Sequence, residues 1–156
     1  MYDVLPLPRI VMAVAEARGR DVIEMTMKMG QAAVEAQMKG VYARFLTNLT
    51  PGRFGQRFDQ VINHFYDFAP LTAAAEGPHG ARIVRKGMPL CIAEWWAVVT
   101  IPFVKVPLEA NGAREVAVEW RPTPAGIQQA TPMGDVVCDV KWAAAEVPAS
   151  PGPRYR

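Results

Sequence analysis

One stretch of the chain decides the fold: Gly134-Asp135-Val136-Val137-Cys138-Asp139-Val140-Lys141-Trp142. The Gly-Asp pair is typical of a turn, and the side chains after it alternate between apolar and mostly polar. Because successive side chains of a strand point to opposite faces, this alternation predicts a strand with one buried face. Cys138 lies on the apolar side, where a small thiol is most simply a core residue.

Length and composition predict a single globular domain. The chain has 156 residues, of which 51% are hydrophobic and 21% charged, so it can bury a core without disulfides or metals. We expect one α+β domain over residues 1–142 and a flexible tail over residues 143–156. The formal net charge of +2 is too small to predict a nucleic-acid-binding surface.

The cysteines and the N-terminus predict a cytoplasmic location. Cys91 and Cys138 are far apart in sequence, and their spacing is typical neither of a disulfide framework nor of a zinc site. The first residues contain Asp3 and two prolines, Pro6 and Pro8, where a secretion signal would need its basic region. We therefore expect a reduced protein without a secretion signal.

The most apolar stretch, residues 88–108, is close in length to the roughly 20 residues that span a bilayer. Glu94, Lys105 and two prolines, Pro102 and Pro107, interrupt it. A charge in the middle of a span costs about 3 kcal/mol. The sequence therefore predicts a buried core helix, bent near Pro102, and no transmembrane segment.

Three helices are predicted in the first half of the chain. They cover about residues 9–17, a long helix from an Asp21 cap to about Leu46, and a helix that starts at Thr50-Pro51 and ends before Pro70. The long helix has a row of apolar positions at helical spacing, namely Val22, Met25, Met29, Ala33 and Ala36. Its glycines, Gly30 and Gly40, suggest close helix packing, including packing against a second subunit. The third helix carries a core stripe that consists of Phe54, Phe58, Val61, Ile62, Phe65 and Phe68.

Strands are predicted over residues 81–86, 115–120 and 134–142, with turn-rich connections at residues 71–80 and 121–133. The first connection could include the start of a strand. The last two strands can pair as an antiparallel hairpin beside the strand near Ile83. The fold class is therefore α+β, in which N-terminal helices and one apolar helix pack on a small antiparallel sheet.

This element order, with Gly134-Asp135 and a cysteine shortly after it at Cys138, resembles the 4-vinyl reductase-like domain. The superfamily of that domain also holds haem nitric-oxide sensors and Golgi-transport TRAPP subunits. The segment from Leu49-Thr50-Pro51-Gly52-Arg53 to Phe68, with Ile83 and Trp142, looks most like a paralogous myxobacterial family of unknown function. The resemblance implies a helix-mediated dimer and an apolar pocket between helices and sheet.

The sequence departs from the 4-vinyl reductase-like pattern in one respect. Those domains usually carry further cysteines before the last strand, but residues 121–133 contain none. Metal or thiol chemistry implied by the resemblance is therefore in doubt for this chain.

The histidines and cysteines predict no catalytic or metal site. His64 lies at the border of the phenylalanine stripe, where Asp67 could orient its ring, and it is most simply structural. His79 lies in a Gly-Pro-His-Gly turn. Neither cysteine has a nearby histidine in sequence that could act as its base. The two cysteines and two histidines also lack the short paired spacings that zinc ligands show. We expect no bound metal and no resident cofactor.

Glu94, Trp95 and Trp96 are the residues that we expect to line a ligand pocket, together with Cys138, Phe65 and His64. A carboxylate in an apolar helix either pairs with a polar or charged partner, faces solvent, or has a raised pKa in a pocket. An ion pair of Glu94 with Arg82 or Arg85 on the neighbouring strand is more common than a functional role for the carboxylate.

Trp120 and Trp142 end adjacent predicted strands. They predict either a cross-strand aromatic pair or an exposed interface, because tryptophan is enriched in interface hot spots.

Three functional hypotheses follow. The first is a non-enzymatic cytoplasmic binding or assembly module, a homodimer that binds an apolar small molecule or a protein partner. The second is a small enzyme that acts on an apolar or heterocyclic substrate through Cys138 or Glu94. The third is a haem-type sensor that uses His64. Phosphate-binding glycine loops, nucleophile elbows and paired-carboxylate spacings are absent from the sequence, so the common enzyme classes gain no support.

Overall fold

The computed structural model describes residues 6–40, 43–46, 49–65 and 69–143, without the side chains of Phe45, Val61, His64 and Phe65. Of the predicted tail, Ala143 is instead the last residue of a strand, and residues 144–156 lie outside the described part, as does Phe68. In chain order the elements are α1 Pro6–Ala17, α2 Val22–Lys39, α3 Ala43–Leu46, the 3-10 turn η1 Pro51–Arg53, α4 Phe54–Phe65, β1 Leu71–Ala75, β2 Gly80–Pro89, the 3-10 turn η2 Leu90–Ile92, α5 Ala93–Ala110, β3 Arg114–Gln128 and β4 Thr131–Ala143.

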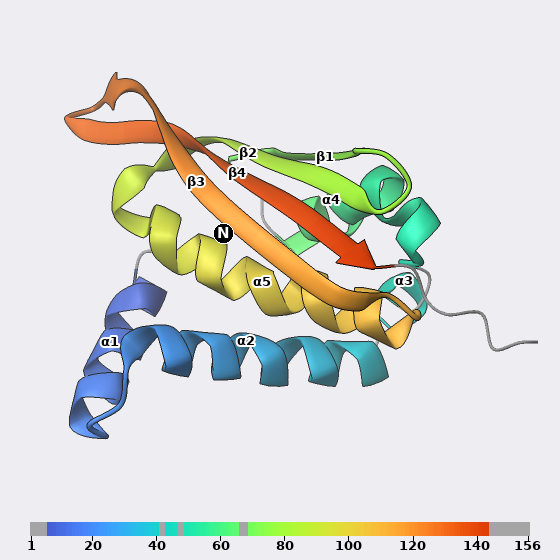
Figure 1. The fold of residues 1–156 in the computed structure, drawn as a ribbon. Coiled ribbons are helices and arrows are strands. Elements are labelled where there is room, and N and C mark those ends of the chain that lie inside the picture. The colour runs from blue at the N-terminus through green and yellow to red at the C-terminus, as the bar shows by residue number, and fades with distance from the viewer. Residues whose placement is uncertain (1–5, 41–42, 47–48, 66–68, 144–156) are drawn as a thin grey trace, which may run out of the picture.

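The predicted α+β class is confirmed. The four strands of the described residues form one antiparallel sheet in the order β1-β2-β4-β3, so the last of these strands in sequence is a central strand of the sheet. α5 runs along one face of this sheet, and α2 packs on the far side of α5 (Figure 1). The central helix is thus covered by the sheet on one side and by α2 on the other.

The hairpin of β3 and β4 is longer than predicted, and its turn lies before Gly134-Asp135, the pair predicted to form a turn. Residues 121–133 belong almost entirely to the two strands, and the chain reverses at Gln129 and Ala130, which have φ values of 48° and 61°. Positive φ at both central residues is what a two-residue hairpin turn requires. Pro122 and Pro124 conceal the strand in the sequence, but β3 is an edge strand, where proline is tolerated.

Gly134-Asp135 is therefore not a turn, and that prediction is wrong. A Cβ at Gly134 would lie 2.6 Å from a Leu90 methyl group and 2.7 Å from the Thr123 carbonyl, so this point of β4 has room only for glycine. The Asp135 carboxylate accepts a hydrogen bond of 3.0 Å from the backbone N–H of Gly87. Gly87 lies where β2 shifts register, so Asp135 holds a bulge of the neighbouring strand.

The helices differ from the predictions mainly at their ends. The Asp21 cap is confirmed, because its carboxylate accepts a 2.9 Å hydrogen bond from the N–H of Glu24. The long second helix is in fact two helices, since α2 ends at Lys39 with Gly40 as its C-cap and α3 follows. Thr50 precedes η1, as predicted, but its side chain makes no capping bond.

Gly30 permits close packing inside this chain. A Cβ at Gly30 would lie 2.7 Å from Cγ of Pro102 on α5. Glycine therefore lets α2 approach the proline ring of the central helix, and the interpretation of Gly30 as a contact to a second subunit is wrong.

α5 is long and apolar enough to cross a membrane, by length and composition alone. The stretch Leu90–Ala110 meets these two criteria, but 50% of its most apolar part is buried inside the fold. The core helix of a soluble protein meets the same criteria. The position of α5 between α2 and the sheet agrees with the predicted core helix.

Candidate functional site

The predicted pocket residues on α5 are divided between its two sides. Trp96 is buried, Trp95 is half-buried, and Glu94 is exposed in the first turn of the helix. Cys138 lies on the core face of β4, with Ile83 of β2 and Trp120 of β3 as its neighbours in register. Trp96 and Cys138 thus share the core cluster between α5 and the sheet, and Glu94 lies outside it.

The centre of that layer contains a charged side chain. Arg85 of β2 is 0% exposed, and its guanidinium carbon lies 4.9 Å from the centroid of the Trp96 ring. In register it lies between Leu71 of β1 and Val136 of β4. A cation over a desolvated indole face gains about 2 kcal/mol, which offsets part of the cost of burying the charge.

Glu94 is not the ion-pair partner that the sequence suggested for Arg82. Arg82 is exposed on the other face of the sheet, where its Nε lies 2.8 Å from Asp139 and 3.1 Å from Glu76. Arg85 is buried beneath Trp96, whereas Glu94 is exposed. The alternation of Ala81, Ile83 and Arg85 was the signal for a buried arginine, because these three residues share one face of the strand.

Cys138 is a buried thiol rather than a nucleophile. Burial, and to a smaller degree the negative charge of Asp139, raises its pKa to about 12. At neutral pH the thiolate that would attack a substrate is therefore almost absent.

We expect a thiol reagent to distinguish the two cysteines. In the folded protein at pH 8 it should modify Cys91, which is exposed, and leave Cys138 unmodified; both should react after unfolding. Titration with Ellman's reagent in buffer and in guanidinium measures this, with Cys91→Ser as the control. Rapid modification of Cys138 in folded Cys91→Ser protein would contradict the assignment.

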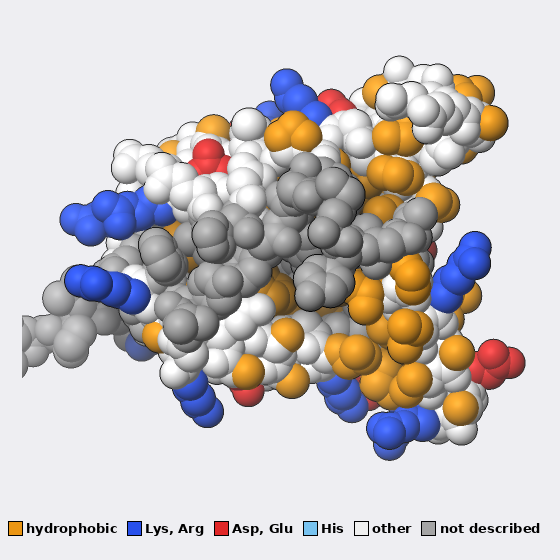
Figure 2. Space-filling model, turned by 180° about the vertical axis from the view of Figure 1, so that it is seen from behind, with side chains coloured by type: hydrophobic (Ala, Val, Ile, Leu, Met, Phe, Trp, Pro, Cys, Tyr) orange, Lys and Arg blue, Asp and Glu red, His pale blue; other side chains and the backbone are white. Residues whose placement is uncertain are grey.

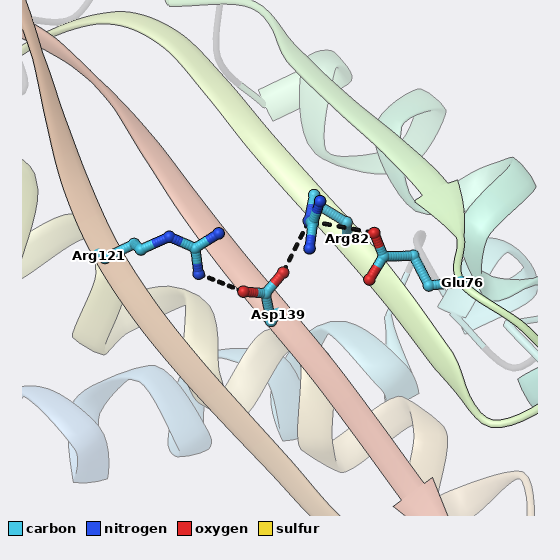
Figure 3. Close-up of polar contacts among 4 residues, drawn as sticks. All are labelled: Glu76, Arg82, Arg121 and Asp139. Carbon is cyan, nitrogen blue, oxygen red and sulfur yellow. Dashed lines mark hydrogen bonds and ion pairs between the residues drawn. The ribbon is translucent and has the colours of Figure 1, made fainter.

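The outer face of the sheet carries an ionic network that joins three strands. Asp139 of β4 accepts hydrogen bonds from Arg82 of β2 and Arg121 of β3, and Arg82 also pairs with Glu76 after β1 (Figure 3). Arg121, followed by Arg82, holds the pKa of Asp139 below its usual range. The carboxylate therefore stays charged at neutral pH and links the central strand to both its neighbours.

The described residues do not assemble a metal site. They contain no group of three or more histidine, cysteine, aspartate or glutamate side chains that could hold an ion. His79 is exposed in the turn between β1 and β2, and its carbonyl accepts a 3.0 Å hydrogen bond from the N–H of Trp142. The side chains of His64 and Phe65 lie outside the described part, so their predicted place in a pocket stays a prediction.

The two strand tryptophans do not form the predicted cross-strand pair. Trp120 lies opposite Cys138, four positions along β4 from Trp142. Trp142 is 6% exposed and packs edge-on against Phe54 of α4, with 6.1 Å between the ring centroids. An exposed interface role is therefore wrong for Trp142, whose ring is part of the core, whereas Trp120 is half-buried.

An apolar surface is left on the helical side of the molecule. The exposed large hydrophobic side chains of the described residues are, apart from Ile127 near the hairpin turn, Leu7, Ile10 and Met12 of α1 and Ile23 and Met29 of α2. Figure 2 shows hydrophobic side chains at the surface along the edge where the hairpin end and α1 lie. Basic and acidic side chains surround them.

The apolar row of α2 contributes to this surface. An apolar row normally marks the buried face of a helix. Here Thr26, Gly30 and Val34 are the residues that α2 buries. Met29, Ala33 and Ala36 of the apolar row are exposed instead. These three residues, the neighbouring exposed Ala32 and the half-buried Met25 form one apolar strip of the helix surface. We name this set the α2 stripe: Met25, Met29, Ala32, Ala33 and Ala36.

A cleft of about 420 Å³ lies beside the turn between α1 and α2. Its lining is formed by Arg18, Arg20, Glu24, Met25 and Lys28. It is open and four of its five lining residues are charged, whereas the resemblance implied an apolar pocket between helices and sheet.

Comparison with known proteins identifies a fold but no close relative. No family model matches the chain, and no curated protein matches it. Among solved structures, a Cs H-NOX mutant superimposes with a TM-score of 0.66 at 12% identity and covers 93% of this chain and 76% of its own. A mutant of T. tengcongensis H-NOX gives a TM-score of 0.64 at 13% identity, with 93% and 76% covered.

An oxygen-binding H-NOX domain related to soluble guanylate cyclases, solved as its oxygen complex, gives a TM-score of 0.63 at 13% identity and covers 100% of this chain and 77% of its own. The chain therefore has the H-NOX fold, which agrees with the haem-sensor part of the predicted resemblance. At this level of identity, the likeness concerns the fold alone.

Proposed function

We propose that this chain is a non-catalytic assembly module that forms a homodimer through the apolar surface of α1 and α2. The observation that carries the proposal is the α2 stripe, an apolar strip that the fold leaves largely exposed beside the residues that α2 buries. Contiguous exposed apolar surface in a soluble domain marks a protein or ligand contact. A cytoplasmic location is part of the proposal and is supported by two free cysteines.

The experiment is sedimentation equilibrium of the full chain and its Met29→Glu variant. We expect the wild type to have twice the 17.1 kDa mass of the chain. Met29→Glu should raise the dissociation constant at least about tenfold, because dimerisation would then desolvate a carboxylate. Thr72→Glu adds the same charge at an exposed position of β1 and is the matched control. A monomeric wild type at all concentrations would refute the proposal.

A haem-based sensor is the second candidate, because one structural neighbour is described as an oxygen-binding H-NOX domain. Haem iron is usually held by histidine, a cysteine thiolate, methionine or tyrosine. Among the described residues, His79 is an exposed turn residue and Cys138 is a buried thiol with a raised pKa. The layer between α5 and the sheet is occupied by Trp96 and Arg85. These residues do not fit a haem.

A haem titration separates the two candidates. The assembly module should show no saturable absorption change with stoichiometric hemin, and His64→Ala should behave like the wild type. A sharp haem band that is lost in His64→Ala would favour the sensor. An enzyme acting through Cys138 or Glu94 gains no support, since one residue is buried and protonated and the other is exposed on the helix.

We also propose that the chain is related to 4-vinyl reductase-like domains, TRAPP subunits and the myxobacterial family of unknown function. This relationship is supported by the element order and by the Gly134-Asp135 and Cys138 pattern.

A further inference from the structure

A row of alternating charges runs beside the α2 stripe. Glu24, Lys28, Glu35 and Lys39 are all exposed. Within the chain, Lys28 Nζ lies 2.5 Å from Glu24, and the Gln31 amide donates a 2.9 Å hydrogen bond to Glu35. At about 100° per residue the four charges lie within about 60° of one another and adjoin the stripe on one side. The row and the stripe therefore belong to one surface.

The charges of this row complement the same row read backwards. From the start to the end of α2 the charges are negative, positive, negative and positive. From the end to the start they are positive, negative, positive and negative. An isologous contact places the same surface patch of both subunits against each other. If two copies of α2 meet antiparallel, centred between Gln31 and Ala32, each charge faces one of opposite sign.

We infer that the partner of the α2 stripe is α2 of a second copy of this chain, packed antiparallel, with Glu24 opposite Lys39 and Lys28 opposite Glu35. This inference rests on the proposed homodimer and adds its geometry. Ala32, Ala33 and Ala36 have small side chains, which allow the two helices to approach closely. Met25 and Met29 pack beside the alanines at the two ends of the contact.

A parallel pair would not use these features. Its two-fold axis runs along the helices, so the charged flank of one helix would meet the opposite flank of the other. On α2 that flank contains Thr26 and Gly30, which are buried within the chain. Only the antiparallel arrangement brings the charged row against itself.

Cysteine cross-linking tests the register. In a Cys91→Ser background, the double variant Glu24→Cys with Lys39→Cys should form a disulfide-linked dimer on mild oxidation. Glu24→Cys alone should not form this dimer. Positions 24 and 39 are 15 positions apart in sequence, so the two copies of position 24 would lie about 22 Å apart along the helices. Cross-linking in the single variant would indicate a parallel pair and overturn the inference.

A charge swap gives an independent readout. Lys28→Glu should weaken the dimer about tenfold, because it creates like-charge contacts at two symmetric places. Adding Glu35→Lys should restore wild-type affinity. Within one helix the double variant keeps repulsive i,i+4 neighbours at 24/28 and 35/39, so a purely intrahelical role predicts no rescue.

The outcomes separate this inference from the proposed function. A wild-type dimer that neither cross-links through positions 24 and 39 nor shows charge-swap rescue would overturn the antiparallel register and leave the homodimer standing. A monomeric wild type would overturn both. Circular dichroism of each variant confirms that the fold is intact.

Discussion

Replacing Trp96 with alanine is expected to lower the free energy of unfolding by about 3–5 kcal/mol. The ring is 1% exposed and lies in the core cluster between α5 and the sheet. Its loss creates a cavity and removes the aromatic face over which Arg85 lies. The guanidinium would then stay buried without its cation–π contact, so the cost should lie in the upper part of this range.

Urea denaturation followed by circular dichroism measures this effect. Trp95→Ala is the matched control, since Trp95 is the adjacent residue on the same helix but is only half-buried. Trp96→Phe, which retains a smaller aromatic face, should lose less than Trp96→Ala. Equal losses for Trp95→Ala and Trp96→Ala would show that Trp96 is not the centre of this layer.

The second large effect is expected at Gly55, where α4 touches the backbone of β1. A Cβ at this position would lie 2.5 Å from the amide nitrogen of Ala75 and 2.8 Å from its Cα. These atoms belong to a paired strand and cannot rotate away as a side chain could. Gly55→Ala should therefore cost about 2–3 kcal/mol, although alanine favours the helix by close to 1 kcal/mol.

The same chain offers a control three residues earlier. A Cβ at Gly52 meets nothing within 4 Å, so Gly52→Ala should leave the free energy of unfolding almost unchanged. Thermal unfolding of the two variants in parallel gives the comparison. Similar melting temperatures for both would mean that β1 moves to accept the methyl group, and that the close approach at Gly55 does not limit stability.

Local sequence signals predicted the elements that depend on them. Asp21 satisfies an N–H at the start of α2, and the alternation from Val136 to Trp142 identified a strand whose apolar face is buried. The buried rings of Phe54 and Phe58 agree with the predicted stripe. Each of these features depends on residues that are close together in sequence, so the local sequence is sufficient to predict the helix start, the strand and the buried helix face.

The remainder depended on contacts between distant parts of the chain. Pro122 and Pro124 are compatible with a strand only because β3 is at the sheet edge, and the edge is a property of the topology. α2 buries Thr26 and Gly30 because Gly30 fits against Pro102, a residue more than seventy positions away. For the same reason, the exposure of the α2 stripe becomes visible only in the folded structure.

The central place of β4 has a consequence for synthesis on the ribosome. The strand that pairs with both β2 and β3 is the last of the described elements to be translated. Until it emerges, β1 and β2 can pair only with each other and pack against α4, so the sheet stays incomplete. The apolar face of α5 then lacks most of its sheet cover, and the nascent chain exposes the kind of surface that chaperones bind. Folding of this domain is therefore completed only after β4 has been translated and joins the two halves of the sheet.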